Sequence, residues 1–160
     1  MAAITSPLSS FLLDVVPTRM LLCIGNALGV LAFALAAKAS TYRQFMFFFS
    51  IMYGIGFGLC IIPPLACGWE WFPERKGFVN GIILAAFGFG AFVFSPIAQA
   101  IVNPENLKPE KLTDGRLMYT AEIASNVPQM LTILALSLAG LGLIAVILVR
   151  RNPDFQGQKS

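Results

Sequence analysis

The side chains best suited to chemistry in this chain are uncharged polar groups set inside long apolar stretches. Asn80 and Gln99 are amides, which can both donate and accept hydrogen bonds. Two interpretations are open for each amide: it lines a solute pathway, or it bonds a neighbouring helix, which is the commoner role. No Asp, Glu, Lys or Arg shares these stretches, so they hold no proton relay and no counter-ion for a charged solute. The other polar residues inside these stretches are Asn26, Ser50, Tyr53, Ser95, Thr132 and Ser137.

Enzymatic chemistry finds little support in the residue types. The sequence has 0 His, which removes both the commonest metal ligand and the usual base for a serine nucleophile. Cys23, Cys60 and Cys67 lie in or beside apolar stretches, and their spacing is not that of a zinc site. We therefore expect no catalytic residue, no metal and no cofactor, and read the cysteines as small apolar side chains.

The amino-acid composition indicates whether these groups lie in water or in lipid. The 160 residues are 57% hydrophobic and 12% charged, with a mean hydropathy of +0.76, whereas soluble domains carry roughly 25% charged residues. The net charge is only +3 and falls in the polar segments, so no basic face for nucleic acid is expected. These values predict a single domain in a lipid bilayer.

Four uncharged apolar segments are long enough to cross the hydrocarbon, which takes roughly 20 residues of α-helix. Backbone groups in lipid must be bonded within the segment, and the absence of strict alternation argues against a barrel. The sequence therefore predicts an all-α membrane protein with four transmembrane helices. Their expected ranges are 20–37, 44–67, 78–102 and 127–149.

The polar segments divide the rest of the chain. Residues 1–19 form an N-terminal segment, of which 1–17 is too short to span and is read as a remnant or an interfacial stretch. A polar loop over 103–125 and a polar tail over 150–160 follow. An even number of spans places both ends on one side, and basic residues near the helix ends lean weakly toward a cytosolic side.

A short hairpin over 68–77 joins the second and third spans. Trp69 and Trp71 suit a membrane interface. Glu70, Glu74, Arg75 and Lys76 are read as a solvated set of opposite charges.

Small residues and prolines punctuate the spans. Glycines at helical spacing let a neighbouring backbone approach closely, so they predict tight helix packing. Pro63, Pro64 and Pro96 predict kinks, which either border a pathway or only serve packing. The packing glycines are Gly25, Gly29, Gly54, Gly56, Gly58, Gly77, Gly81, Gly88 and Gly90.

One stretch carries a family resemblance. Trp71-Phe72-Pro73-Glu74-Arg75-Lys76-Gly77-Phe78-Val79-Asn80-Gly81, continued by Phe87-Gly88-Phe89-Gly90-Ala91 and Ser95-Pro96, resembles the helix 4, loop and helix 5 region of the major facilitator superfamily. The most similar branch is that of oxalate/formate antiporters and monocarboxylate transporters. Upstream, Asp14 and Arg19 match the loop motif between helices 2 and 3, although Ser and Pro replace its two glycines and Val15 replaces an Arg.

The resemblance implies that the four spans are helices 3 to 6 of a twelve-helix transporter, and so a partial bundle that other membrane chains complete. It implies that Tyr53, Asn80, Ser95 and Gln99 face a central cavity. It also implies that Asp14, Arg19, Glu74 and Arg75 belong to motifs that brace a conformational state.

Two functional hypotheses follow. In the first, the chain is a fragment or split part of a secondary carrier for small organic anions of the monocarboxylate, oxalate or formate type, working by alternating access. In the second, it is a carrier-derived structural subunit that does not transport and belongs to a larger membrane complex, for example in the mitochondrial inner membrane. Its membrane is then either the plasma membrane or the inner membrane of an organelle.

Overall fold

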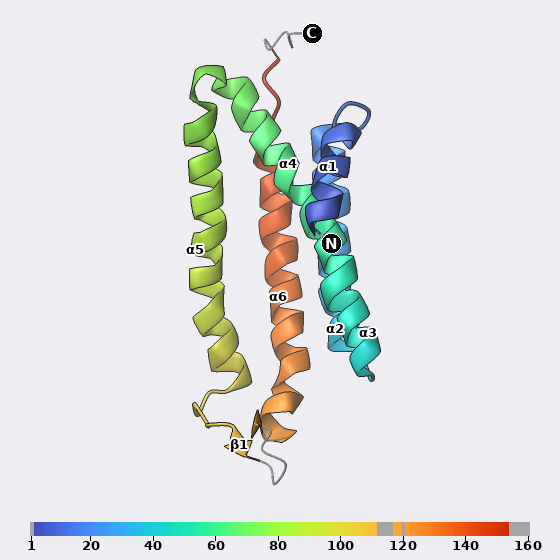
Figure 1. The fold of residues 1–160 in the computed structure, drawn as a ribbon, viewed down its shortest axis with the longest axis vertical. Coiled ribbons are helices and arrows are strands. Elements are labelled where there is room, and N and C mark those ends of the chain that lie inside the picture. The colour runs from blue at the N-terminus through green and yellow to red at the C-terminus, as the bar shows by residue number, and fades with distance from the viewer. Residues whose placement is uncertain (1, 112–116, 120, 154–160) are drawn as a thin grey trace.

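The computed structural model describes residues 2–111, 117–119 and 121–153 (Figure 1). The expected all-α membrane fold is confirmed. The helices are α1 (Ala2–Leu12), α2 (Thr18–Ala37), α3 (Tyr42–Met46), the π-helical turn η1 (Phe47–Met52), α4 (Tyr53–Trp71), the 3-10 turn η2 (Pro73–Arg75), α5 (Lys76–Val102) and α6 (Ala121–Leu148).

Four helical segments are long and apolar enough to cross a membrane: Thr18–Ala37, Tyr42–Trp71, Pro73–Val102 and Ile123–Leu148. Each overlaps one predicted span. The second runs through α3, η1 and α4 without a break in the helix, and is longer than expected at both ends. Figure 1 shows that the turns before α2 and after α4 lie at one end of the bundle, and the loop after α5 at the other.

The polar loop between α5 and α6 contains two short strands that the sequence did not indicate. β1 (Glu110–Lys111) pairs antiparallel with β2 (Leu117–Met118), outside the spans. The loop begins at Asn103, whose side-chain amide donates to the Leu107 carbonyl and accepts from the Leu107 N–H, both at 2.9 Å. The predicted loop also ends too late, because α6 already begins at Ala121. Of the predicted tail over 150–160, residues 154–160 lie outside the described residues.

The N-terminal segment is a helix that packs along α4, and not only a remnant or an interfacial stretch. Ser9 is fully buried in this contact, and its hydroxyl donates to the Leu59 carbonyl at 3.1 Å. In an α-helix that carbonyl would accept from the residue four positions on, but Pro63 has no N–H to give. The α1 helix therefore satisfies the backbone group that Pro63 leaves open.

The core forms where α2 meets α4 and α6. Phe33 and Ala36 of α2 are buried against Leu131 and Ala135 of α6. Each helix presents its small or apolar face to the other, so the contact needs no polar group. This pair of contacts makes α2 the centre of the bundle.

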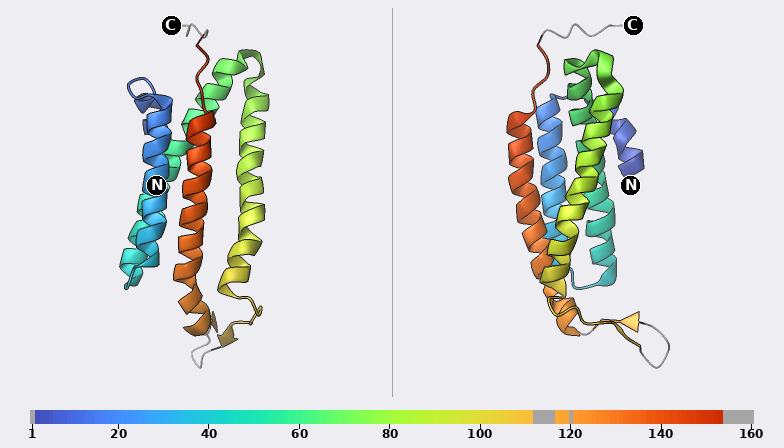
Figure 2. Two further views of the ribbon diagram at one scale, coloured as in Figure 1. Left: turned by 180° about the vertical axis from the view of Figure 1, so that it is seen from behind. Right: turned by 90° about the vertical axis from the view of Figure 1, so that its left-hand side faces the viewer.

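The α5 helix stands apart from this core. Figure 2 shows it running beside α6 along the edge of the bundle. Its contacts with α4 and α6 are sparse, and Val79 is its only buried residue. One hydrogen bond ties each end of α5 to a neighbouring helix. Near its start, the Trp69 indole N–H of α4 donates to Asn80 Oδ1 at 2.8 Å. At its end, the Asn126 amide of α6 donates to the Val102 carbonyl at 3.2 Å.

Candidate functional site

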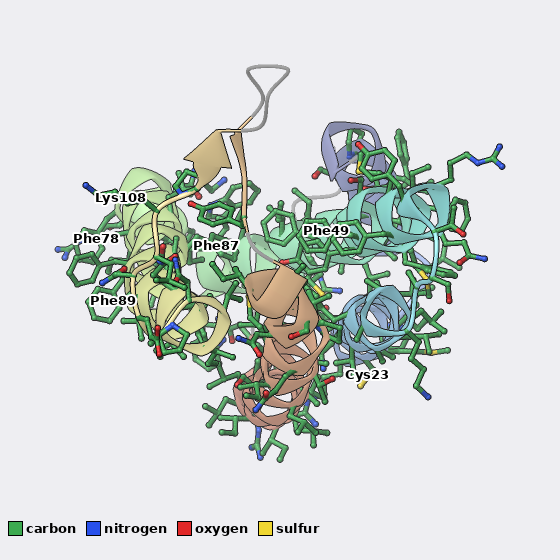
Figure 3. All side chains as sticks on the ribbon, turned by 90° about the horizontal axis from the view of Figure 1, so that it is seen from below. Cys23, Phe49, Phe78, Phe87, Phe89 and Lys108 are labelled. Carbon is green, nitrogen blue, oxygen red and sulfur yellow. The ribbon has the colours of Figure 1, made fainter. Side chains whose placement is uncertain are left out.

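An aromatic cavity of about 350 Å³ lies between α2, α4, α5 and α6. It sits where α5 separates from the core. Its lining includes Phe33 of α2, Tyr53 and Phe57 of α4, Phe87 of α5 and Ser137 of α6. Figure 3 shows Phe87 directed from α5 toward the inside of the bundle, whereas Phe78 and Phe89 of the same helix point outward. The cavity is thus lined by four helices, with residues from Phe33 to Leu141 of the sequence.

A chain of ring contacts builds the cavity wall. The Phe33 and Tyr53 rings have centroids 4.8 Å apart, Tyr53 and Phe57 are stacked at 6.0 Å, and Phe57 meets Phe87 edge to face at 5.9 Å. Tyr53 and Phe57 are four residues apart on α4, so they share one helix face. Edge-to-face and offset rings prefer these separations, which gives the wall a defined shape.

The cavity can bind an apolar body and offer it few polar contacts. The polar side chains on its lining are Tyr53 and Ser137, and the Ser137 hydroxyl donates within its own helix to the Ile133 carbonyl at 2.9 Å. No lining residue is charged. Tyr53 therefore carries the other polar group among the described lining side chains.

The four residues predicted to face the central cavity of a transporter lie in different places in the structure. Tyr53 lines the aromatic cavity between α2, α4, α5 and α6. Asn80 instead bonds Trp69 across the turn between α4 and α5, in the interhelical role that was the commoner interpretation. Ser95 is exposed on α5, and Gln99 is exposed and donates to Asn106 Oδ1 at 3.3 Å.

A second site, which is polar, joins the ends of α4 and α6. Glu70 is 6% exposed, and its Oε1 accepts from Arg151 Nε at 2.7 Å and from an Arg151 terminal nitrogen. Glu70 Oε2 accepts from the Asn152 backbone N–H at 3.2 Å. The prediction that Glu70 belongs to a solvated hairpin is therefore wrong, because its carboxylate is paired with a residue 81 positions later. These hydrogen bonds to Glu70 raise the pKa of Arg151.

The conformational-motif candidates fall around this pair. The Arg19 guanidinium donates to the Val149 carbonyl at 2.9 Å, and Asp14 acts electrostatically on Arg151. Glu74 and Arg75 are exposed in η2. Asp14 and Arg19 thus lie beside the end of α6, while Glu74 and Arg75 face solvent on the same side of the bundle.

The predicted packing glycines divide into two groups. A Cβ added to Gly56 would lie 2.7 Å from the Gly25 carbonyl oxygen and 3.0 Å from the Gly29 nitrogen. Gly54 and Gly58 are half-buried and buried on the same helix. By contrast, a Cβ on Gly77, Gly81, Gly88 or Gly90 would meet nothing within 4 Å.

Two parts of these sites were missed from the sequence. The first is the aromatic wall that includes Phe33, Phe57 and Phe87. Its one usable signal in the sequence was the spacing of four residues between Tyr53 and Phe57. The pairing of Glu70 with Arg151 carried another, since both residues end apolar spans that must finish on the same side. Neither signal identifies the partner helix, which the fold alone provides.

Part of this chain is similar in sequence to known transporters. The chain is 43% identical over 89 residues to Apicoplast pyruvate carrier 1 of Toxoplasma gondii, covering 55% of this chain and 16% of that protein. It is 31% identical over 98 residues to the MFS-type transporter opdF of Penicillium oxalicum, covering 61% and 23%. It is 26% identical over 102 residues to Monocarboxylate transporter 12 of Rattus norvegicus, covering 64% and 21%.

These matches span only about a fifth of each relative's length. No protein-family profile matches the chain, and no solved structure matches it. The relatives are transporters rather than enzymes, and four apolar helices place this chain in a membrane as a multi-pass protein. The resemblance predicted from the sequence is confirmed: over part of its length, this chain is similar to transporters of the monocarboxylate and major facilitator type.

Proposed function

We propose that this chain forms part of a secondary carrier for small organic anions of the monocarboxylate type. The observation that carries the proposal is the aromatic cavity of about 350 Å³ between four membrane helices of a chain related to a pyruvate carrier. The cavity suits the carbon body of a small solute, and the Tyr53 hydroxyl gives that solute one hydrogen-bond donor.

A carboxylate in this cavity also needs a positive charge or further donors, because burying an unpaired charge is costly. The residues on the described lining are uncharged. We therefore propose that another part of the carrier faces this cavity and supplies the cation. The α5 helix leaves room for it, since its contacts with α4 and α6 are sparse and Val79 is its only buried residue.

The test is uptake of labelled pyruvate by liposomes that hold the protein purified with all the chains that accompany it in mild detergent. We expect Tyr53→Phe to lower uptake about tenfold, the effect of losing one hydrogen bond to a charged group. Tyr42→Phe is the matched control, because Tyr42 is 75% exposed and lies away from the cavity.

Unchanged uptake after Tyr53→Phe would contradict the role of the cavity. The structural-subunit hypothesis predicts instead that neither the wild type nor any variant takes up pyruvate. It is favoured by the exposed apolar surface of α5, which suits assembly with another membrane protein. Fixed-ratio co-purification with a large complex, together with no uptake by any variant, would favour that subunit role over the carrier.

A further inference from the structure

A pocket rich in arginine lies at the end of the bundle where α2 begins and α6 ends. It has a volume of about 450 Å³ and is lined by Pro17, Thr18, Arg19, Val149, Arg150 and Arg151. Figure 2 shows these two helix ends side by side. We propose that this pocket binds a phosphate group, in the first place that of an anionic phospholipid at the membrane surface.

Counted over the described residues, the charges at the pocket are positive in sum. Arg151 is neutralised by Glu70, and Asp14 also acts on Arg151. Arg19 and Arg150 are exposed and add two further positive charges. The three arginines therefore outnumber the two carboxylates that face them.

Within the part of the chain that the structure describes, the arginines also keep unused hydrogen-bond donors. Each guanidinium carries several N–H groups in a planar fork that fits phosphate oxygens. The bond from Arg19 to the Val149 carbonyl uses only its Nε. The bonds from Arg151 to Glu70 use its Nε and one terminal nitrogen.

The two helix ends reinforce this charge. The α2 helix starts after Pro17 with no side-chain cap, so its first N–H groups add partial positive charge beside Arg19. The carbonyl end of α6 would oppose it, but two of its carbonyls already have donors. Val149 accepts from Arg19, and Arg150 accepts from the Trp71 indole N–H at 2.9 Å.

Neighbouring apolar side chains favour a lipid as the source of the phosphate. Met20 at the start of α2, and Ile147 and Leu148 at the end of α6, are 55%, 68% and 72% exposed. They lie one step into the spans from the arginines, where acyl chains begin. Trp71 is 50% exposed beside Arg150, as expected for a residue at the interface. A basic pocket between helix ends with this surround suits an anionic headgroup.

The experiment is native mass spectrometry of the purified protein, with its accompanying chains, released from nanodiscs of phosphatidylcholine with added phosphatidylglycerol. The wild type is expected to retain phosphatidylglycerol in preference to phosphatidylcholine. Arg150→Gln should lower that retention about fivefold, and adding Arg19→Gln should lower it by a similar factor again. Arg151 is left intact because it also holds Glu70.

Lys76→Gln is the matched control, since it removes one exposed positive charge from the same end of the bundle, outside the pocket. Equal retention of both lipids, or an equal loss with Lys76→Gln, would overturn the proposal. A parallel titration with inorganic phosphate separates the two sources. Protein that binds inorganic phosphate and retains no lipid overturns the lipid source, and protein that binds neither overturns the pocket itself. Arg150→Gln changes only an exposed side chain, so misfolding would not explain its loss.

Discussion

The crossing of α2 and α4 differs sharply from the α5 helix, although both are apolar helices dotted with glycine. At the crossing, Gly25 and Gly56 bring two backbones into contact, and α1 and α6 cover the flanks. Along α5, a Cβ added to any of the glycines would meet nothing within 4 Å, and one residue is buried. The difference teaches that small residues permit close packing without choosing its partner. A tightly packed helix crossing and a loosely packed helix can therefore have the same kinds of residues.

The largest effect is expected from filling the helix crossing. Gly56→Leu should lower the free energy of unfolding by about 3 kcal/mol, because its Cβ would meet backbone atoms of α2 that cannot move independently. Gly81→Leu on α5 should change it little, since nothing lies within 4 Å. Thermal unfolding in mild detergent measures both. Equal losses would show that α5 is as tightly packed as the core.

Next comes the ion pair that ties α4 to the end of α6. Arg151→Gln should cost about 2 kcal/mol, because it leaves the buried Glu70 carboxylate without its charged partner. Glu70→Gln should cost less, since the Arg151 side chain is 55% exposed and water can solvate it. The same unfolding assay tests this asymmetry. A larger loss for Glu70→Gln than for Arg151→Gln would contradict the burial of Glu70.

A smaller loss is expected where α1 meets α4. Ser9→Ala should cost about 1 kcal/mol, because the Leu59 carbonyl would be left buried without a donor. Ser10→Ala is the matched control, as Ser10 is the exposed neighbour on the same helix. Identical melting temperatures for the two variants would place α1 outside the cooperative core.

The smallest effect concerns the tie that holds the start of α5. Asn80→Ala removes the acceptor of the Trp69 indole N–H and should cost about 0.5 kcal/mol. Its readout is local: amide hydrogen exchange should rise in the first turns of α5 and stay unchanged in α2. Exchange that rises equally in both helices would mean that α5 and the core open as one unit. Gln99→Ala, at an exposed bond near the other end of α5, serves as the control.

The four spans could be predicted from the sequence because length and the absence of charge are local properties. Tyr53 was assigned by resemblance to the central cavity of a complete transporter, which stays a prediction; in this structure it lines the aromatic cavity between α2, α4, α5 and α6. The partner of Glu70 could not be predicted, because the cations Arg75 and Lys76 stand closer in sequence than Arg151 and suggest a different pairing. The α1 helix was missed for a similar reason: its contact with α4 depends on Ser9 and Pro63, which have no visible relation until the helices are side by side.

The bond from Ser9 to Leu59 has a mechanical consequence. A proline in the middle of a helix usually creates a pliable joint, since the missing N–H lets the two halves swing. Here the Leu59 carbonyl that Pro63 leaves without a donor accepts a hydrogen bond from Ser9 of α1, which limits bending of α4 at this point. We therefore expect the segment of α4 around Leu59 and the α1 helix to move as one unit, so that a bend in one helix displaces the other.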